Sequence, residues 1–183
     1  MADRLRVAIA AGGTAGHINP ALALAEELSS RGHDVRFYGQ PTRLEATLVP
    51  QAGFPFSPID VTGFDRSRPW TLVSALWRMR KAQSVLGQDF SRDGAPDVAV
   101  GFGAYVELPL INWCHDHGIP CVIHEQNSVP GLANKSSARK VKCVCVSLPV
   151  AIDAFKDRVS ADTQIVVTGN PVRRSVLAGD RAR

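Results

Sequence analysis

The residues best suited to chemistry lie in three short segments, each of which follows a run of apolar residues. The first segment contains Gly12, Gly13, Thr14, Ala15, Gly16 and His17. Glycines let backbone N–H groups approach an anion closely, and the start of a helix adds a partial positive charge. We therefore predict that segment 12–17 binds a phosphate or diphosphate. The alternative is that its glycines only form a tight turn between a strand and a helix.

The second and third segments carry further polar groups. They contain Gly101, Phe102, Gly103, Ala104 and Tyr105, and then His124, Glu125, Gln126 and Asn127. Polar side chains are costly to bury without partners, and imidazole, carboxylate and amide groups suit sugar hydroxyls. We expect segment 101–105 to accept an anion and segment 124–127 to contact a ligand. Tyr105 either bonds to a sugar or packs at the rim of the site.

His17 is the leading candidate for acid–base chemistry. Imidazole titrates near neutral pH, so a histidine within hydrogen-bonding reach of a hydroxyl group can remove its proton. The alternative is that His17 only bonds to its own loop or to a phosphate. His124 is the second candidate for the base, and the sequence leaves the choice between the two histidines open.

The motifs argue against several other kinds of site. Thr14 and His17 stand where the dinucleotide fingerprint G-x-G-x-x-G requires its second and third glycines, and no Gly-Lys-Ser/Thr motif is present. The four cysteines lack C-x-x-C spacing, so we expect reduced thiols in a cytosolic protein and neither a metal site nor a cofactor. These cysteines are Cys114, Cys121, Cys143 and Cys145.

Short apolar runs alternate with helical patterns along the chain, which predicts an α/β fold: a Rossmann-like parallel sheet with helices on both faces. The expected strands are 5–11, 34–38, 98–101, 121–124, 143–147 and 164–168, and the expected helices are 21–28, 44–49, 109–117 and 131–138. The carboxyl ends of parallel strands lie at one edge of a sheet. The three polar segments should therefore line one crevice.

Two Asn-Pro pairs predict helix starts, because asparagine caps a helix and proline fits its first position. Asn19 and Pro20 begin the first such helix, which should end near Gly32, and Asn170 and Pro171 begin the second. Because few residues follow the second pair, we expect residues 1–183 to be part of a longer protein.

Composition and charge narrow the class of protein further. The chain has 183 residues, of which 45% are hydrophobic and 21% charged, as in ordinary globular domains. No apolar run is long enough to span a bilayer, and the first residues lack the pattern of a secretion signal. A net charge of +4 allows nucleic acid, anionic lipid or a phosphorylated ligand as a partner.

Positive charge and tryptophan gather in segment 64–86. The segment contains one acid, Asp65, and five cations, which are Arg66, Arg68, Arg78, Arg80 and Lys81. Between them lie the apolar residues Phe64, Trp70, Val73, Leu76 and Trp77. A second cationic cluster contains Lys135, Arg139, Lys140 and Lys142. The helical spacing of the apolar residues predicts either a stripe facing the core or a patch for an anionic membrane surface. No nucleic-acid-binding motif accompanies the charge, so we expect no nucleic acid partner.

Four motifs, in order, resemble those of the MurG family of cell-wall glycosyltransferases, and they span nearly the whole chain. They lie at residues 12–23, 101–106, 124–135 and 169–173. The resemblance implies a GT-B enzyme with two Rossmann-like domains, of which this chain is the N-terminal, acceptor-side half. The donor-binding C-terminal half has no counterpart here. The resemblance also favours the membrane patch, formed by Trp70, Val73, Trp77, Arg78, Arg80, Lys81 and Lys140.

The resemblance implies roles for individual residues. Those matching contacts to the UDP-sugar donor are Thr14, Ala15, Gly16, Asn127 and Arg173. Those matching acceptor or diphosphate contacts are Gly12, Gly13, Gly103, Ala104, Tyr105, His124, Glu125 and Asn134, and His17 matches a residue linked to acceptor binding or catalysis. Ala15 and Ala104 stand where the family usually has glycine, so a positive φ at either position would be strained.

The activity implied is inverting transfer of N-acetylglucosamine from UDP-N-acetylglucosamine to the C4 hydroxyl of lipid I, the undecaprenyl-diphospho-muramoyl-pentapeptide. Such an enzyme acts in peptidoglycan synthesis at the cytoplasmic face of the membrane, with other cell-wall proteins as potential partners. The alternatives are another GT-B transferase or UDP-sugar epimerase, and a non-catalytic lipid-docking module.

Overall fold

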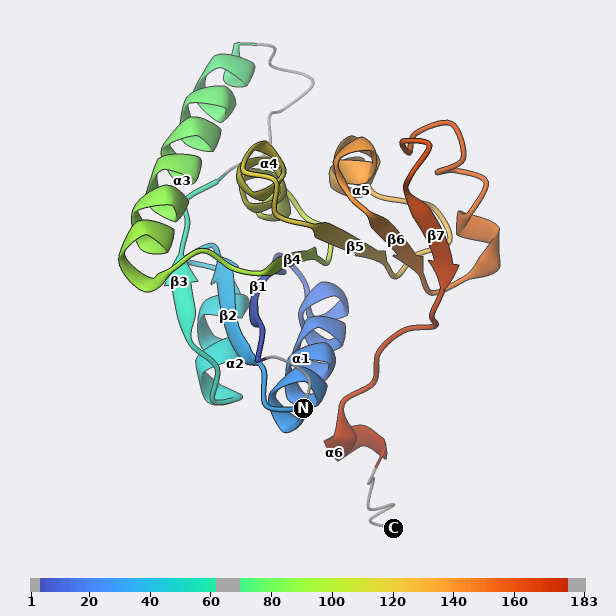
Figure 1. The fold of residues 1–183 in the computed structure, drawn as a ribbon, viewed down its shortest axis with the longest axis horizontal. Coiled ribbons are helices and arrows are strands. Elements are labelled where there is room, and N and C mark those ends of the chain that lie inside the picture. Colours follow the sequence, from blue (N-terminus) through green and yellow to red (C-terminus); the bar gives the residue numbers. More distant parts are fainter. Residues whose placement is uncertain (1–3, 62–69, 178–183) are drawn as a thin grey trace.

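A computed structural model describes residues 4–61 and 70–177. Its centre is a seven-stranded parallel sheet with the strand order β3-β2-β1-β4-β5-β6-β7 (Figure 1). The strands are β1 (Arg6–Ala10), β2 (Asp34–Gly39), β3 (Phe56–Pro58), β4 (Val98–Gly101), β5 (Cys121–Glu125), β6 (Cys143–Val146) and β7 (Gln164–Val167). The predicted α/β fold with a Rossmann-like parallel sheet is confirmed.

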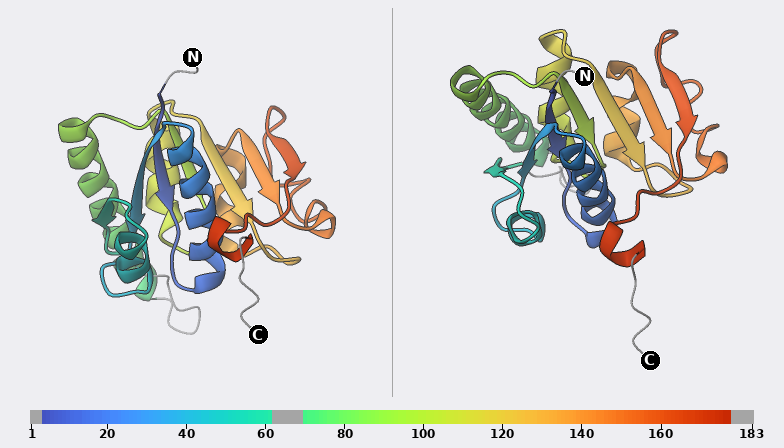
Figure 2. Two further views of the ribbon diagram at one scale, coloured as in Figure 1. Left: turned by 90° about the horizontal axis from the view of Figure 1, so that it is seen from below. Right: turned by 60° about the horizontal axis from the view of Figure 1, so that its bottom comes forward.

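Helices cover both faces of the sheet (Figure 1). One face carries α1 (Ala15–Ser30) and α2 (Glu45–Gln51), and the other carries α3 (Thr71–Asp93), α4 (Glu107–Asp116) and α5 (Leu132–Ser137). Two short 3-10 helices, Ala138–Lys140 and Pro149–Ala151, and the final helix α6 (Arg174–Leu177) complete the described chain. α6 lies beside α1 (Figure 2).

The sheet separates two hydrophobic clusters. Central strands are buried on both faces, which is why their sequences read as nearly continuous apolar runs. Ile9 and Phe37 pack toward α1 and α2, whereas Ala99, Ile123 and Val144 pack toward α3, α4 and α5. These clusters fix the strands, and the strands fix the loops at their ends.

All strands run in the same direction, so the segments that follow them meet at one edge (Figure 2). The turns after β1, β4 and β5 contain the three polar segments predicted from the sequence. Because these strands are consecutive neighbours in the sheet, the expectation that the segments line one crevice is confirmed.

Several predicted boundaries are wrong. α1 begins at Ala15 with Thr14 as its extended N-cap, so Pro20 lies inside the helix, where it removes one intrahelical hydrogen bond near the start. α4 begins at Glu107, before the proline expected to open it, and α6 begins at Arg174 rather than at the second Asn-Pro pair. The three-residue strand β3 was not predicted, because it is too short for a clear pattern.

Candidate active site

A cavity of about 240 Å³ lies between the three polar segments. It is lined by His17, Gly103, Ala104, Tyr105, Glu125, Asn127, Gly131, Leu132, Ala133 and Asn134. The lining residues come from the first turn of α1, the turn between β4 and α4, and the segment from the end of β5 into α5. We call this cavity the His17 pocket.

His17 has one ring nitrogen available for chemistry. Its Nδ1 lies 3.1 Å from the carbonyl oxygen of Gly12. A carbonyl oxygen can only accept, so Nδ1 carries a proton, and Nε2 has no hydrogen-bond partner among the described residues. Nε2 lies 3.5 Å from the point that a Cβ on Gly103 would occupy. The ring is therefore in the tautomer that a general base requires.

His124 has neither ring nitrogen free. Its Nε2 donates to the carbonyl oxygen of Gly169 at 3.0 Å, and its Nδ1 accepts from the Gln126 amide at 3.2 Å. Burial lowers the pKa of His124, which favours the neutral ring. The structure thus favours His17 over His124 as the base, and His124 instead ties the end of β5 to the segment after β7.

Glu125 organises the segment that follows β5. Its buried carboxylate accepts hydrogen bonds from the backbone N–H and side-chain amide of Asn127, at 2.9 and 3.0 Å. It also accepts from the Gly131 N–H at 3.0 Å and from the Asn134 amide at 2.8 Å. These four internal bonds occupy the carboxylate, and the expected contact of Glu125 with a sugar stays a prediction.

Asn134 lines the pocket and carries one acceptor atom without a partner among the described residues. Its amide nitrogen donates to the carboxylate of Glu125 and to the carbonyl oxygen of His124, which fixes the side-chain orientation. Its Oδ1 is buried and has no partner among the described residues. A buried acceptor without a donor is costly, so this atom is suited to a ligand hydroxyl.

Both glycine turns are occupied by the protein's own carboxylates. The Gly13 N–H donates to Glu45 at 3.2 Å, and the Gly103 N–H donates to Glu107 at 2.7 Å. Both glutamates are buried. The prediction that these two amides bind a phosphate is therefore wrong, because each already has an anionic partner inside the protein.

Neither glutamate was singled out in the sequence. Glu45 lies at the start of α2 and Glu107 at the start of α4, positions where an acidic residue ordinarily stabilises the exposed end of a helix. That expected role gives no signal of burial against a neighbouring glycine turn.

Burial raises the pKa of Glu107 to about 7, whereas its ordinary value is 4.5. The folded state binds this proton more tightly than the unfolded state, so the contribution to stability is full below pH 4.5 and is lost as the pH rises to about 7. We expect Glu107→Gln to gain roughly 3 kcal/mol relative to wild type between pH 4.5 and 8. Urea unfolding at both pH values measures this difference, and an equal offset at both would contradict it.

Ala104 is the single non-glycine residue with positive φ in the described ranges 4–61 and 70–177, at 65°. A Cβ in this left-handed region costs about 1 to 2 kcal/mol. Ala15 avoids the strain because it is helical. We expect Ala104→Gly to stabilise the protein by about 0.5 to 1 kcal/mol, after allowing for the greater freedom of glycine in the unfolded chain. A higher urea midpoint supports this expectation, and a lower one contradicts it.

The first turn of α1 has backbone N–H groups without partners among the described residues, a feature suited to an anion. Ala15 and Gly16 are the first two residues of a 16-residue helix, so their N–H groups have no intrahelical partner, and no side chain caps the helix. They line a second cavity of about 400 Å³ with Asn19 and Arg173. We call this the α1 pocket.

Arg173, predicted to contact a donor, is paired inside the protein. Its guanidinium lies 2.8 Å from a carboxylate oxygen of Glu26 on α1. Arg174 pairs in the same way with Glu27. The segment after β7 is thereby held against α1, with Arg173 at the wall of the α1 pocket.

The tryptophan-rich face of α3 points to solvent. Trp70, Val73 and Trp77 are 71%, 73% and 62% exposed, so the alternative of a stripe facing the core is wrong. Lys81 lies over the Trp77 ring. Phe64, Asp65, Arg66 and Arg68 fall outside the described residues. We call the exposed apolar residues at the start of α3 the α3 surface. They are Trp70, Val73, Leu76 and Trp77.

The predicted second cationic cluster is separate from the α3 surface. Lys140 follows α5 and donates to Asn112 on α4 at 2.7 Å. α4 lies between α5 and α3 (Figure 1). Lys142 pairs with Asp162 on the loop before β7.

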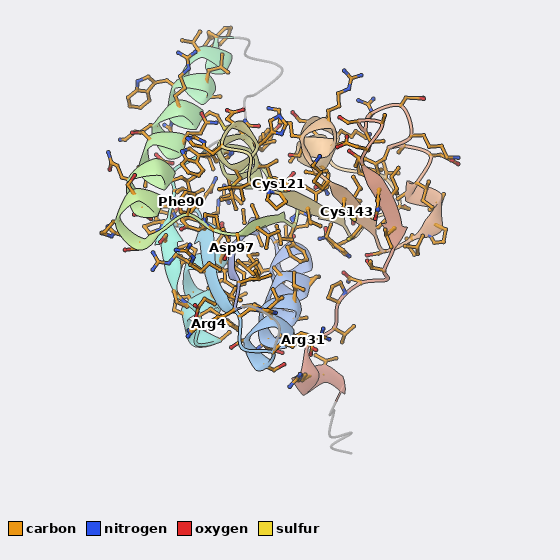
Figure 3. All side chains as sticks on the ribbon, in the orientation of Figure 1. Arg4, Arg31, Phe90, Asp97, Cys121 and Cys143 are labelled. Carbon is orange, nitrogen blue, oxygen red and sulfur yellow. The ribbon has the colours of Figure 1, made fainter. Side chains whose placement is uncertain are left out.

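The cysteines are free thiols, as expected. Cys121 and Cys143 lie on the neighbouring strands β5 and β6 (Figure 3). Within residues 4–61 and 70–177, no three His, Cys, Asp or Glu side chains gather as metal ligands would. The helices described contain no segment long and apolar enough to cross a membrane.

Comparison with protein families identifies the family of this chain. Residues 7–157 match the glycosyltransferase family 28 N-terminal domain. This chain belongs to glycosyltransferase family 28. The match includes all three segments that line the His17 pocket and ends before the segment that carries Arg173.

Curated relatives in family 28 are similar over nearly all of the chain. The chain is 38% identical to a Thermoanaerobacter protein over 94% of its length and 47% of the relative's, and to a Bacteroides fragilis protein over 96% and 45%. Both relatives are named UDP-N-acetylglucosamine–N-acetylmuramyl-(pentapeptide) pyrophosphoryl-undecaprenol N-acetylglucosamine transferase. The chain spans about half the length of these relatives.

Solved structures agree with this family. The crystal structure of Acinetobacter baumannii MurG matches with a TM-score of 0.72 and 30% identity, over 90% of this chain and 45% of that one. The kitacinnamycin glycosyltransferase shares the fold with a TM-score of 0.66 at 17% identity, over 100% of this chain and 56% of that one.

Proposed function

We propose that this chain is the acceptor-side domain of an inverting N-acetylglucosaminyltransferase that converts lipid I to lipid II in peptidoglycan synthesis. The observation that carries the proposal is the His17 pocket, in which an imidazole with a free Nε2 faces a cavity between three loops. In this reaction the C4 hydroxyl of the muramyl sugar attacks the anomeric carbon of UDP-N-acetylglucosamine. His17 removes the hydroxyl proton as the bond forms.

The two pockets suit different parts of the substrates. Glu125 lines the His17 pocket and Glu107 lies behind it, and their carboxylates disfavour a phosphate there. An uncharged sugar ring fits better, with Asn134 Oδ1 accepting from a hydroxyl group. The α1 pocket combines free helix N–H groups with Arg173, which also pairs with Glu26. We expect the donor diphosphate, and the negative charge that UDP gains on leaving, to lie there.

A second domain would complete the donor-binding site. We propose that residues 1–183 form the N-terminal domain and that a donor-binding domain follows in the complete protein, called here the two-domain protein. Thr14, at the start of α1, and Asn127, exposed at the rim of the His17 pocket, lie where they could meet a donor from that side.

The α3 surface would hold the protein at the cytoplasmic leaflet, where a lipid-linked acceptor is found. Exposed tryptophans enter the headgroup region, while the neighbouring cations Arg78, Arg80 and Lys81 attract anionic lipid. Lys140, which follows α5 on the same face of the sheet as α3, would add a further positive charge. At that location we expect other cell-wall synthesis proteins to be partners.

Membrane binding through the α3 surface predicts a clear effect of two substitutions. Trp70→Ser with Trp77→Ser should weaken binding to vesicles containing phosphatidylglycerol by at least tenfold, because each ring buries apolar area in the interface. Sedimentation with vesicles at low and high salt measures this. Val166→Ser with Val167→Ser, on the exposed strand β7, is the matched control. Equal binding of all three proteins would contradict the membrane role.

A transfer assay tests the proposed function. The two-domain protein, given labelled UDP-N-acetylglucosamine and lipid I, should yield labelled lipid II, whereas the 183-residue chain alone should yield none. Transfer to simple sugars instead would favour another GT-B transferase, and conversion of the donor without an acceptor would favour an epimerase. Binding of lipid I without turnover by the two-domain protein would favour a non-catalytic docking module.

A further inference from the structure

Glu107 is placed to control the His17 pocket without lining it. It is the first residue of α4, its side chain is fully buried, and it is absent from the residues that form the cavity wall. Its carboxylate therefore acts on a substrate only through neighbouring residues of the protein.

The carboxylate joins two of the three loops around the pocket. One oxygen accepts from the Gly103 N–H at 2.7 Å, in the turn after β4, and the other accepts from the Ser137 hydroxyl at 3.1 Å, on α5. A Cβ on Gly101 would lie 2.5 Å from the same carboxylate, so glycine there leaves the room that the carboxylate needs.

The turn held by Glu107 forms the wall of the pocket nearest His17. Gly103 and Ala104 both have positive φ, at 85° and 65°, and the strain at Ala104 means that the turn needs an external hold to keep this shape. Nε2 of His17 lies 3.5 Å from the Cβ position of Gly103. Movement of the turn would therefore change the space next to the basic nitrogen.

We propose that Glu107 is a positioning residue for the acceptor: by holding the Gly103 N–H, it fixes the turn against which the sugar hydroxyl is aligned with His17. The inference rests on the proposed glycosyl transfer. The bond to Gly103, rather than the charge itself, does the positioning, so any side chain that presents an acceptor oxygen at the same reach should suffice.

Protonation of Glu107 does not break its hydrogen bond to the Gly103 N–H, because of the groups that surround the carboxyl. The facing groups are the Ser137 hydroxyl from α5, the Gly103 N–H from the preceding turn and the charge of Glu125 from β5. Burial raises the pKa of Glu107 to about 7. A protonated carboxyl still offers its carbonyl oxygen to Gly103 while its O–H donates to Ser137.

Three variants of the two-domain protein distinguish the effect of the hydrogen bond to Gly103 from the effect of the charge on Glu107. Glu107→Gln keeps the reach and one acceptor oxygen but removes the charge. Glu107→Asp keeps the charge but is one methylene too short to reach Gly103. Ser137→Ala removes the other hydrogen bond and leaves the Gly103 contact, so it is the matched control.

Steady-state kinetics with lipid I at a temperature where every variant is folded give the first readout. We expect Glu107→Asp to lower kcat/KM for the acceptor at least tenfold without changing KM for the donor, and Glu107→Gln and Ser137→Ala to stay within about threefold of wild type. A merely structural role would lower the unfolding temperature of Glu107→Asp and leave its kcat/KM near wild type, which would overturn the inference.

The second readout needs no turnover. In the ¹⁵N-labelled 183-residue chain carrying His17→Ala, which removes the neighbouring imidazole, the Gly103 amide resonance should titrate with a midpoint near pH 7. With Glu107→Gln added it should not. A Gly103 amide that does not titrate in the His17→Ala chain would overturn the contact. If wild-type two-domain protein transfers no sugar, the proposed function and the acceptor role of Glu107 both fail. If transfer is normal and Glu107→Asp is unaffected, only this inference fails.

Discussion

Replacing His17 by alanine in the two-domain protein is expected to lower kcat by at least about a hundredfold, with little change in KM for either substrate. The reason is the tautomer: Nδ1 is held by the Gly12 carbonyl, so Nε2 is the nitrogen that can take the proton. Alanine removes that nitrogen and leaves the backbone of the first turn of α1 in place. Single-turnover rates with lipid I measure the chemical step directly.

His115→Ala is the matched control for this result. His115 lies near the end of α4, where its Nδ1 contacts the carbonyl oxygen of Lys140, and it does not line the His17 pocket. Its kcat should equal that of wild type. A His17→Ala enzyme that keeps more than a tenth of wild-type kcat would remove the base assignment.

Replacing Glu125 by alanine is expected to lower the free energy of unfolding of the 183-residue chain by about 3 kcal/mol. Four donors lose a charged acceptor at once, and the side chain is only 1% exposed, so water does not replace all of those bonds. The orientation of Asn134 is lost with them, so binding of an acceptor analogue should weaken as well. Urea unfolding gives the first effect and titration calorimetry the second.

Asn127→Ala provides the comparison. Asn127 is exposed and its side chain makes one of the four bonds to Glu125, so its loss should cost about 1 kcal/mol or less. Equal destabilisation by both substitutions would show that the carboxylate is not the centre of this loop.

The sequence predicted the sheet and the three converging segments because both depend on local patterns. Apolar runs such as 121–124 alternate with helical stretches, and parallel strands place their following loops at one edge. His17 could be singled out because it directly follows a glycine-rich turn. The role expected for it stays a prediction until the kinetic test.

What the sequence could not supply was the pairing of groups far apart in the chain. Gly13 bonds to Glu45 and Gly103 to Glu107, and these contacts depend on how the turns fold over the ends of the helices. The hydrogen bond between His124 and the Gly169 carbonyl likewise joins residues 45 positions apart, so nothing in the sequence indicated that this ring is held by the protein. Glycine turns that look like anion sites can thus be filled by a carboxylate from the same chain.

An NMR titration of the ¹⁵N-labelled 183-residue chain with a short-chain lipid I analogue shows whether the acceptor binds in the His17 pocket. The largest shifts should fall on His17, Gly103, Ala104, Tyr105 and Asn134, which line that pocket. Saturable binding whose largest shifts fall instead on the α1 pocket, or no binding at concentrations up to the millimolar range, would contradict this prediction.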